Sequence, residues 1–477
     1  MASATDVIQR LGGPGPRVAD PPAFLIVPAQ EDPARLSAYA ALRRRAFVEE
    51  QGLFARDDSD EHDGAAHTVV LVAAAADGAV LGGVRLHPEG DDAGLGWWRG
   101  SRLVVGVDAG SARGRVACAL VTAACVAAVD RGALRFDAHA QQDHVAFFER
   151  LGWHRVRALA GTPTAHALMR WPVDRFAALA AATKSALGPL LAGLVASGDG
   201  WRGDDGVPVP GSDLVAATDA ILPAMVERDP EWAGWCGMLV TAHDLSAMGA
   251  APIGAMDTLG AVDAAHAERI VRGLRSGAEA FDLPVLGGHT TLGVPGSLGV
   301  TGFGHAQRPV PAGGGVAGDV LSLTADLAGG WRPGYRGRQW DSTSGRSREE
   351  LRAMLGAVGA ARPRAAKDVS MAGVVGTAGM LAEASGCGAE LDVAALPRPS
   401  GVDAGDWMTC FPGFGMLTAD REDAPPLPAG PAVGARIGRL DAGPGIRLRW
   451  PDGDVTAALE GPVTGLGRAG GDDGVPG

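Results

Sequence analysis

Glycine and proline recur along this chain and divide it into short segments. They limit the length of the helices and strands that the chain can form. The 477 residues include 72 glycines and 32 prolines, about a fifth of the total, just below the roughly 25–30% at which low complexity becomes the first interpretation. Hydrophobic residues make up 46% and charged residues 20%, as in a folded, soluble protein. At about 150 residues per domain, the length predicts two to four domains built from short strands and helices.

The composition excludes several classes of protein. The longest uncharged apolar run, residues 116–129, is shorter than the roughly 20 residues of a membrane span and suits a buried core helix. The sequence begins without a basic region and an apolar core, so we expect no secretory signal. Five cysteines without a C-x-x-C pair argue against a disulfide framework or a thiolate zinc site. A net charge of −13 disfavours nucleic-acid and membrane partners, and we expect a cytoplasmic location.

Changes in composition along the chain predict six segments. A helical connector separates a first α/β domain from two further α/β domains, and both ends of the chain are expected to be flexible. The expected segments are a flexible arm (1–22), a first domain (23–172), a connector (173–200), a second domain (201–308), a third domain (309–468) and a disordered tail (469–477).

A strand-to-helix loop in the first domain predicts an anion-binding site. The apolar residues 103–105 lead into the glycine- and arginine-containing residues 109–117, and a long helical pattern follows. Backbone N–H groups and the helix dipole at such a position bind pyrophosphate, and Arg113 and Arg115 add positive charge. The alternative is an ordinary loop with surface arginines.

Motifs around this loop resemble the GNAT acetyltransferase superfamily over residues 24–172. They are residues 42–51 (LRRRAFVEEQ), the acidic pair Asp60 and Asp63 with His67, and residues 147–153 (FFERLGW). The resemblance implies a GNAT fold in which acetyl-CoA lies between two splayed strands. The acetyl-CoA contacts that it implies are Val104, Val105, Arg113, Gly114, Arg115, Val116 and Ala117.

Catalytic groups for acetyl transfer are harder to assign. The family's loop has glycine where Arg115 stands, and its final helix usually carries a tyrosine acid where this chain has Phe148, which has no proton to donate. The candidate general bases are Glu50 and His139, with His144 as a further candidate; a solvated helix end and structural histidines are the alternatives.

Four aspartates in the second domain sit beside apolar strands or helices rather than in polar runs. They are Asp204, Asp205, Asp219 and Asp244. Carboxylates from several separate segments suit Mg²⁺ that bridges nucleotide phosphates. The alternative is that they are turn aspartates and a helix cap.

The order of these motifs resembles the aminoimidazole ribonucleotide (AIR) synthetase superfamily over residues 203–466. G-D-D, T-D and residues 244–252 (DLSAMGAAP) are followed by G-G-H-T, and the thiamine-monophosphate kinases look most similar. The resemblance implies a PurM-like module of two α/β subdomains that binds ATP and Mg²⁺. The ATP contacts that it implies are Gly287, Gly288, His289, Thr290 and Ser370.

This second resemblance has departures of its own. Thr241 and His243 stand where the kinase has Asn and Ser, and residues 367–373 (KDVSMAG) lack the second Asp of the kinase's D-x-S-D-G. Lys367, one of only two lysines in an arginine-rich chain, and Asp368 are predicted to act in catalysis, with a plain surface lysine as the alternative at 367.

Together these features predict an α/β and α+β multidomain enzyme of small-molecule nitrogen metabolism. It would combine an acetyl-CoA-dependent N-acetyltransferase with an ATP–Mg²⁺-dependent phosphoryl-transfer or oxygen-activating activity. The alternative is a regulatory sensor that binds acyl-CoA and ATP with little turnover. The second resemblance also implies a homodimer formed through the sheet of the first subdomain.

Overall fold

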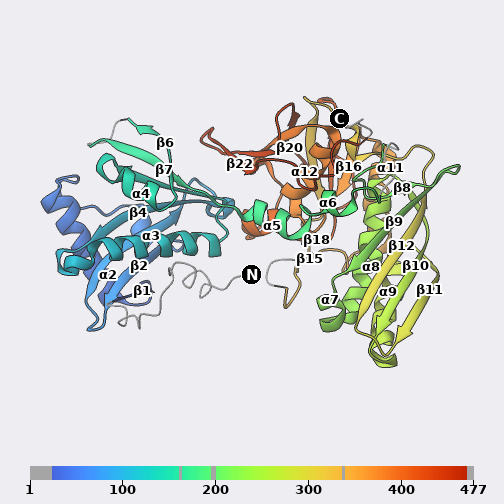
Figure 1. Ribbon diagram of the computed structural model, residues 1–477, viewed down its shortest axis with the longest axis horizontal. Helices are drawn as coiled ribbons and strands as arrows, with labels where there is room; N and C mark the ends of the chain where they lie inside the picture. The colour runs from blue at the N-terminus through green and yellow to red at the C-terminus, as the bar shows by residue number, and fades with distance from the viewer. Residues whose placement is uncertain (1–23, 161–163, 195–199, 336–338, 470–477) are drawn as a thin grey trace. The chain divides into compact units, whose positions relative to one another are not determined.

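The computed structural model describes residues 24–160, 164–194, 200–335 and 339–469 (Figure 1). The chain divides into two compact units, unit 1 (Met1–Val173) and unit 2 (Asp174–Gly477). The predicted flexible arm at residues 1–22, and all of the predicted tail except residue 469, lie outside the described residues.

Unit 1 is built on a seven-stranded sheet in the order β1-β2-β3-β4-β5-β7-β6. Its neighbours pair antiparallel except β4 and β5, which run parallel. The strands are β1 (Phe24–Pro28), β2 (Val69–Ala75), β3 (Val80–Pro88), β4 (Trp97–Val105), β5 (Arg135–Gln141), β6 (His154–Leu159) and β7 (His166–Trp171). The pattern of residues 102–107 predicts a short strand, whereas β4 begins at Trp97 and ends at Val105.

The main helix of unit 1 is α3 (Arg113–Asp130), which buries Leu120, Ala124 and Ala128 against β2, β3 and β4. With the turn before it, Val107–Asp130 is long and apolar enough to cross a membrane by length and composition. Its packing on the sheet is that of a core helix.

Three shorter helical segments complete unit 1: α2 (Pro33–Arg43), the π-helical segment Arg44–Glu50 and α4 (Val145–Arg150). The pattern of residues 36–51 predicts a single helix, but the hydrogen-bond pattern changes after Arg43, and Gln51 N–H donates to the carbonyl oxygen of Ala46.

Unit 2 begins with two connector helices, α5 (Arg175–Thr183) and α6 (Leu187–Leu191). A five-stranded sheet follows, in the order β11-β10-β12-β9-β8. Its strands are β8 (Val207–Pro208), β9 (Leu214–Ile221), β10 (Ala251–Ala261), β11 (Val285–Leu292) and β12 (Ser297–His305). The apolar pattern of residues 207–217 predicts one continuous strand, but this strand is interrupted, because the chain turns where Ser212 N–H donates to the Val209 carbonyl.

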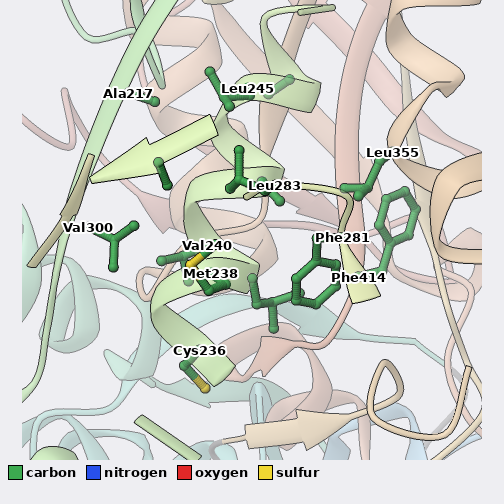
Figure 2. Close-up of a cluster of buried hydrophobic side chains, with 14 of the residues drawn as sticks. Ala217, Cys236, Met238, Val240, Leu245, Phe281, Leu283, Val300, Leu355 and Phe414 are labelled. Atoms are coloured by element: carbon green, nitrogen blue, oxygen red, sulfur yellow. The ribbon is translucent and has the colours of Figure 1, made fainter. Parts of the chain in front are cut away.

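Two long helices, α8 (Pro230–Ala247) and α9 (Ala264–Ala280), cover one face of this sheet (Figure 1), and the short α7 (Pro223–Arg228) precedes them. The two long helices approach so closely that a Cβ on Gly273 would lie 1.8 Å from the Glu231 carbonyl oxygen. Only glycine fits that crossing. Helix α8 is buried along almost its whole length, and Figure 2 shows its Met238, Val240 and Leu245 in the core.

The rest of unit 2 contains a seven-stranded sheet in the order β16-β19-β13-β20-β17-β21-β22 and a small sheet, β14-β15-β18. The strands are β13 (Val320–Ala325), β14 (Gly330–Trp331), β15 (Gln339–Asp341), β16 (Ala365–Asp368), β17 (Gly388–Asp392), β18 (Phe411–Pro412), β19 (Gly415–Asp420), β20 (Val433–Asp441), β21 (Ile446–Arg449) and β22 (Val455–Leu459). The helices are α10 (Arg348–Leu355), α11 (Ala357–Ala361), α12 (Gly373–Ser385) and α13 (Ala404–Thr409). Helix α8 contacts both β16 and α11, so it joins the two sheet layers of unit 2.

Candidate functional site

The G-D-D turn is fixed against the end of β16. Gly203 adopts a positive φ of 81°, and its carbonyl oxygen accepts a 3.0 Å hydrogen bond from Lys367 Nζ. The Asp205 carboxylate is ion-paired with Lys367 and accepts a 3.0 Å hydrogen bond from the Asp368 backbone N–H. The turn thereby places one acidic side chain beside another that lies far away in sequence.

Asp205, Asp244 and Asp368 form an acidic cluster whose carboxylate oxygens lie within 4.8 Å of one another. Asp244 comes from the last turn of α8 and Asp368 from the end of β16. Burial, together with repulsion from neighbouring carboxylates, raises the pKa of Asp244 and of Asp368 well above the usual range. A buried cluster of three carboxylates needs positive charge nearby to balance their negative charges.

Both lysines of the chain supply part of that charge. Burial alone would lower the pKa of Lys367, but the charges of the neighbouring aspartates and the hydrogen bond to Asp205 together raise it. Lys184, at the C-terminal end of α5, is close enough to lower the pKa of Asp219 and of Asp368. No motif predicts a role for Lys184. Its only indication in the sequence is that the chain has just two lysines.

The other two predicted metal ligands lie at the margin of the cluster. Asp219, exposed on β9, raises the pKa of Asp244 and Asp368 through its charge. Asp204 turns instead toward the Ala312 backbone N–H, which donates to it. Its Oδ2 is buried without a hydrogen-bond partner, and burial raises its pKa to about 7.

The predicted ATP contacts fall in two places. Ser370 follows the cluster directly, and its Oγ is buried without a hydrogen-bond partner, whereas Met371, at the position of the missing acid, is 43% exposed. Gly287, Gly288, His289 and Thr290 all lie in the edge strand β11, which is exposed along its length.

Thr241 and His243, the two departures on α8, are core residues. The Thr241 hydroxyl donates a 2.9 Å hydrogen bond to the Gly237 carbonyl oxygen. The His243 ring is 2% exposed, lies edge-on to Phe414 with centroids 5.5 Å apart, and burial lowers its pKa to about 3. Neither side chain therefore bears on the acidic cluster.

Unit 1 contains a cavity of about 840 Å³ where β4 and β5 separate. The parallel pairing of these strands ends at Gly100 and Ala138, although β4 continues to Val105 and β5 to Gln141. Beyond that point the two strands form opposite walls, and the N-terminal end of α3 reaches the same space.

Most of the predicted acetyl-CoA contacts line this cavity. Val104, Val105, Arg113, Gly114 and Ala117 do so. Arg113 donates a 3.3 Å hydrogen bond to the Val105 carbonyl oxygen. Arg115 is exposed and does not line the cavity. Val116 is wholly buried in the core.

The candidate bases Glu50, His139 and His144 all line the cavity. Glu50 is ion-paired with Arg45 at 3.3 Å. Burial lowers the pKa of His139 to about 4, so its imidazole is neutral at pH 7. Phe148 lines the same wall.

Sequence reasoning missed further histidines of this cavity. The rings of His62 and His87 stack with centroids 3.7 Å apart, and His166 also lines the cavity. These residues come from the segment before β2, from β3 and from β7, and only the folded sheet brings them together.

Two family models match unit 2. The AIR synthase related protein N-terminal domain matches residues 203–306 and the C-terminal domain matches residues 316–450. An uncharacterized protein of Synechocystis sp. is 34% identical over 236 residues, covering 48% of this chain and 73% of the relative. A thiamine-monophosphate kinase of Rhodopirellula baltica is 32% identical over 138 residues, covering 27% of this chain and 43% of that protein.

Solved structures also resemble unit 2. The thiamine monophosphate kinase of Aquifex aeolicus is 18% identical with a TM-score of 0.42, covering 53% of this chain and 92% of that one. Hydrogenase maturation protein HypE in complex with ATP is 16% identical with a TM-score of 0.43, covering 53% of this chain and 86% of that one.

Replacing Lys367 with Met tests the charge balance of the acidic cluster. Removing the ammonium leaves Asp205 buried without its partner, a change that costs about 3–5 kcal/mol in other buried pairs. We expect the variant to unfold at a lower temperature in EDTA and to regain much of the loss in Mg²⁺, because a cation that binds only the folded state stabilises it.

Calorimetry with and without Mg²⁺ measures both effects. Arg275→Met, which removes an exposed cation of α9, is the matched control and should change the unfolding temperature little. A Lys367→Met protein as stable as the parent in EDTA would contradict this charge balance.

Proposed function

The chain belongs to the AIR synthase related protein family, and we propose that its unit 2 binds ATP with Mg²⁺ and transfers a phosphoryl group to an oxygen atom of a small molecule. The acidic cluster of Asp205, Asp244 and Asp368 is the observation that carries this proposal. The thiamine-monophosphate kinase among the relatives supports a kinase-type reaction, while Met371, at the position of the missing acid beside the cluster, argues against carrying over its substrate.

The donor set of the cluster fits Mg²⁺. Carboxylate oxygens are the hard ligands that this ion prefers, and three buried carboxylates with a single paired ammonium leave negative charge for a divalent cation to neutralise. Asp205, Asp244 and Asp368 would hold the ion, with Asp219 beside them. When bound, Mg²⁺ neutralises phosphate charge and orients the transferred group.

The residues of the chain then have distinct tasks. Lys367 fixes Asp205 and carries a positive charge next to the cluster, and Lys184 brings a second charge from the connector. The unpartnered Ser370 Oγ is available to donate to a phosphate oxygen. Positioning and charge neutralisation of this kind account for most of the catalysis in phosphoryl transfer, so the absence of an obvious general base is no obstacle.

Nucleotide binding by unit 2 should therefore depend on the metal. We expect ATP to bind in Mg²⁺ and to lose most of its affinity in EDTA, because the carboxylates repel a bare triphosphate. Asp205→Asn or Asp244→Asn should weaken binding by roughly tenfold or more. Isothermal titration calorimetry measures this, with Asp423→Asn, an exposed carboxylate, as the control. Equal ATP affinity in Mg²⁺ and in EDTA would refute the proposal.

For unit 1 we propose acyl-CoA binding followed by N-acetyl transfer. The divergence of β4 and β5, the cavity between them and the position of Arg113 at the start of α3 support this second function. His139, neutral and lining the cavity, is the candidate base. No tyrosine lines the cavity among the described residues, so the departing thiolate would take its proton from another group or from water.

Acetyl-CoA binding should depend on Arg113 more than on Arg115. Arg113→Ala should weaken binding several-fold, whereas Arg115→Ala should have a small effect because Arg115 lies outside the cavity lining. Arg131→Ala, at the other end of α3, is the control. Arg43 is unsuitable as a control because it is buried in ion pairs with Asp58 and Asp63.

Calorimetry with acetyl-CoA distinguishes these variants. Equal binding by the Arg113→Ala protein and the parent would place the acyl-CoA site elsewhere. Binding of acetyl-CoA and of ATP without turnover across a panel of amines would favour the sensor over the bifunctional enzyme.

We also propose that unit 2 forms a homodimer through the sheet face that α8 and α9 leave uncovered. Ile253 and Met256 on β10 and Leu286 on β11 are 42%, 47% and 62% exposed, and β11 is an edge strand with unpaired backbone groups. Exposed apolar edges of this kind invite pairing with another chain, and a two-fold interface needs only one self-complementary patch.

Light scattering of the full chain tests the dimer. We expect about twice the chain mass of 48.4 kDa, and Met256→Glu should shift the protein toward the monomer. Leu190→Glu, an exposed apolar residue of the connector, is the control. A parent protein that stays monomeric at all concentrations would refute the dimer.

A further inference from the structure

A second cavity, of about 210 Å³, lies in unit 2 and is lined by residues of both family domains. Gly249, after α8, and residues 305–308, after β12, come from the N-terminal family domain or directly follow it. Gly359 and Arg362, from the end of α11, come from the C-terminal one. The acidic cluster has no residue in this cavity.

Close backbone contact between the two domains creates the cavity. A Cβ on Gly359 would lie 3.0 Å from the Gly249 carbonyl oxygen, and one on Gly249 would lie 3.3 Å from the Gly359 Cα. These two glycines let the turn after α8 and the helix α11 touch. The side chains on either side of the contact then face a common space.

The cavity is lined by two arginines that make no ion pair with a described carboxylate. Arg308 and Arg362 both line it, and neither makes an ion pair or side-chain hydrogen bond with another residue in the part of the chain that the structure describes. Several other arginines of unit 2 are paired with carboxylates, such as Arg346 with Asp326 and Arg364 with Asp319. No carboxylate lines the cavity, and its histidine, His305, is bonded to Asp213 at 2.6 Å.

The backbone conformation of Arg362 is a second observation that points to a binding site. This residue caps α11 in the left-handed conformation, with φ 52° and ψ 59°, a position that glycine normally fills because a side chain there costs about 1 kcal/mol. Arginine at such a position is unfavourable for the helix itself. Strained positions of this kind concentrate at binding sites.

We infer that this cavity binds the phosphate group of a small metabolite, held between Arg308 and Arg362. Two guanidinium groups form bidentate, charge-assisted hydrogen bonds with phosphate oxygens. The volume admits a phosphate with a small organic group attached. Because the two arginines belong to different domains, the bound anion also fastens one domain to the other. This site is independent of the proposed nucleotide site.

Binding of phosphate in EDTA tests this inference on the full chain. Without Mg²⁺ the acidic cluster repels anions, and the variants at Arg308 and Arg362 distinguish a signal of this cavity from one of the anion site proposed in unit 1. We expect inorganic phosphate to raise the unfolding temperature above that in chloride of equal ionic strength. Arg308→Ala and Arg362→Gly should each weaken binding by about tenfold or more. Ribose 5-phosphate, compared with inorganic phosphate, shows whether the free ion or a phosphate monoester is preferred.

The Arg362→Gly variant separates binding from folding. Glycine suits the left-handed conformation, so this protein should unfold at the same temperature as the parent or higher in chloride, and yet respond less to phosphate. Arg275→Ala, which removes an exposed arginine of α9 outside the cavity, should respond like the parent. Equal stabilisation of parent and Arg362→Gly by phosphate, or no stabilisation of the parent, would overturn the inference.

Discussion

The ion pair between Lys367 and Asp205 holds together the part of unit 2 to which we assign nucleotide binding. It fastens the G-D-D turn to the end of β16, and the Asp368 backbone N–H adds a second contact to the same carboxylate. Asp244 approaches from α8, which is buried between the sheet and the second subdomain. Three acidic groups are thereby held at a distance that their own repulsion opposes, and packing of the surrounding core sustains it.

In the proposed functions, the two units bind an anionic cosubstrate in different ways. Unit 1 separates two parallel strands and places the start of a helix, with Arg113, at the opening. Unit 2 instead gathers negative charge, which suits an anion only when a cation lies between. A net charge of −13 is compatible with both, since local arrangement rather than total charge decides what each site attracts.

The sequence predicted much of this arrangement. The sequence indicates Asp205 and Asp244 as metal ligands and Asp368 as a catalytic residue, and the order of the motifs indicates the family; that these three carboxylates form one cluster is seen only in the fold. Periodicity also placed the main helices to within a few residues. The turn that breaks the strand between Val209 and Ser212 was missed because the apolar residues on both sides suggested one strand.

Other features depend on contacts that a linear pattern does not contain. Lys184 lies 183 positions from Lys367, and no spacing relates them, yet the fold brings both near the same carboxylates. Two other groupings likewise arise where separate elements meet. They are the stacked rings of His62 and His87, and the two arginines, Arg308 and Arg362, that line the second cavity. Arg113 lines the cavity of unit 1 and Arg115 does not, a difference that the loop motif alone left open.

The most direct test of this account is anomalous diffraction from crystals of the full chain grown with Mn²⁺ and a non-hydrolysable ATP analogue. The account predicts a manganese peak within bonding distance of Asp205, Asp244 and Asp368, with the triphosphate on its far side and Lys367 beside it. A nucleotide bound elsewhere, or a manganese ion that none of these three carboxylates touches, would contradict it.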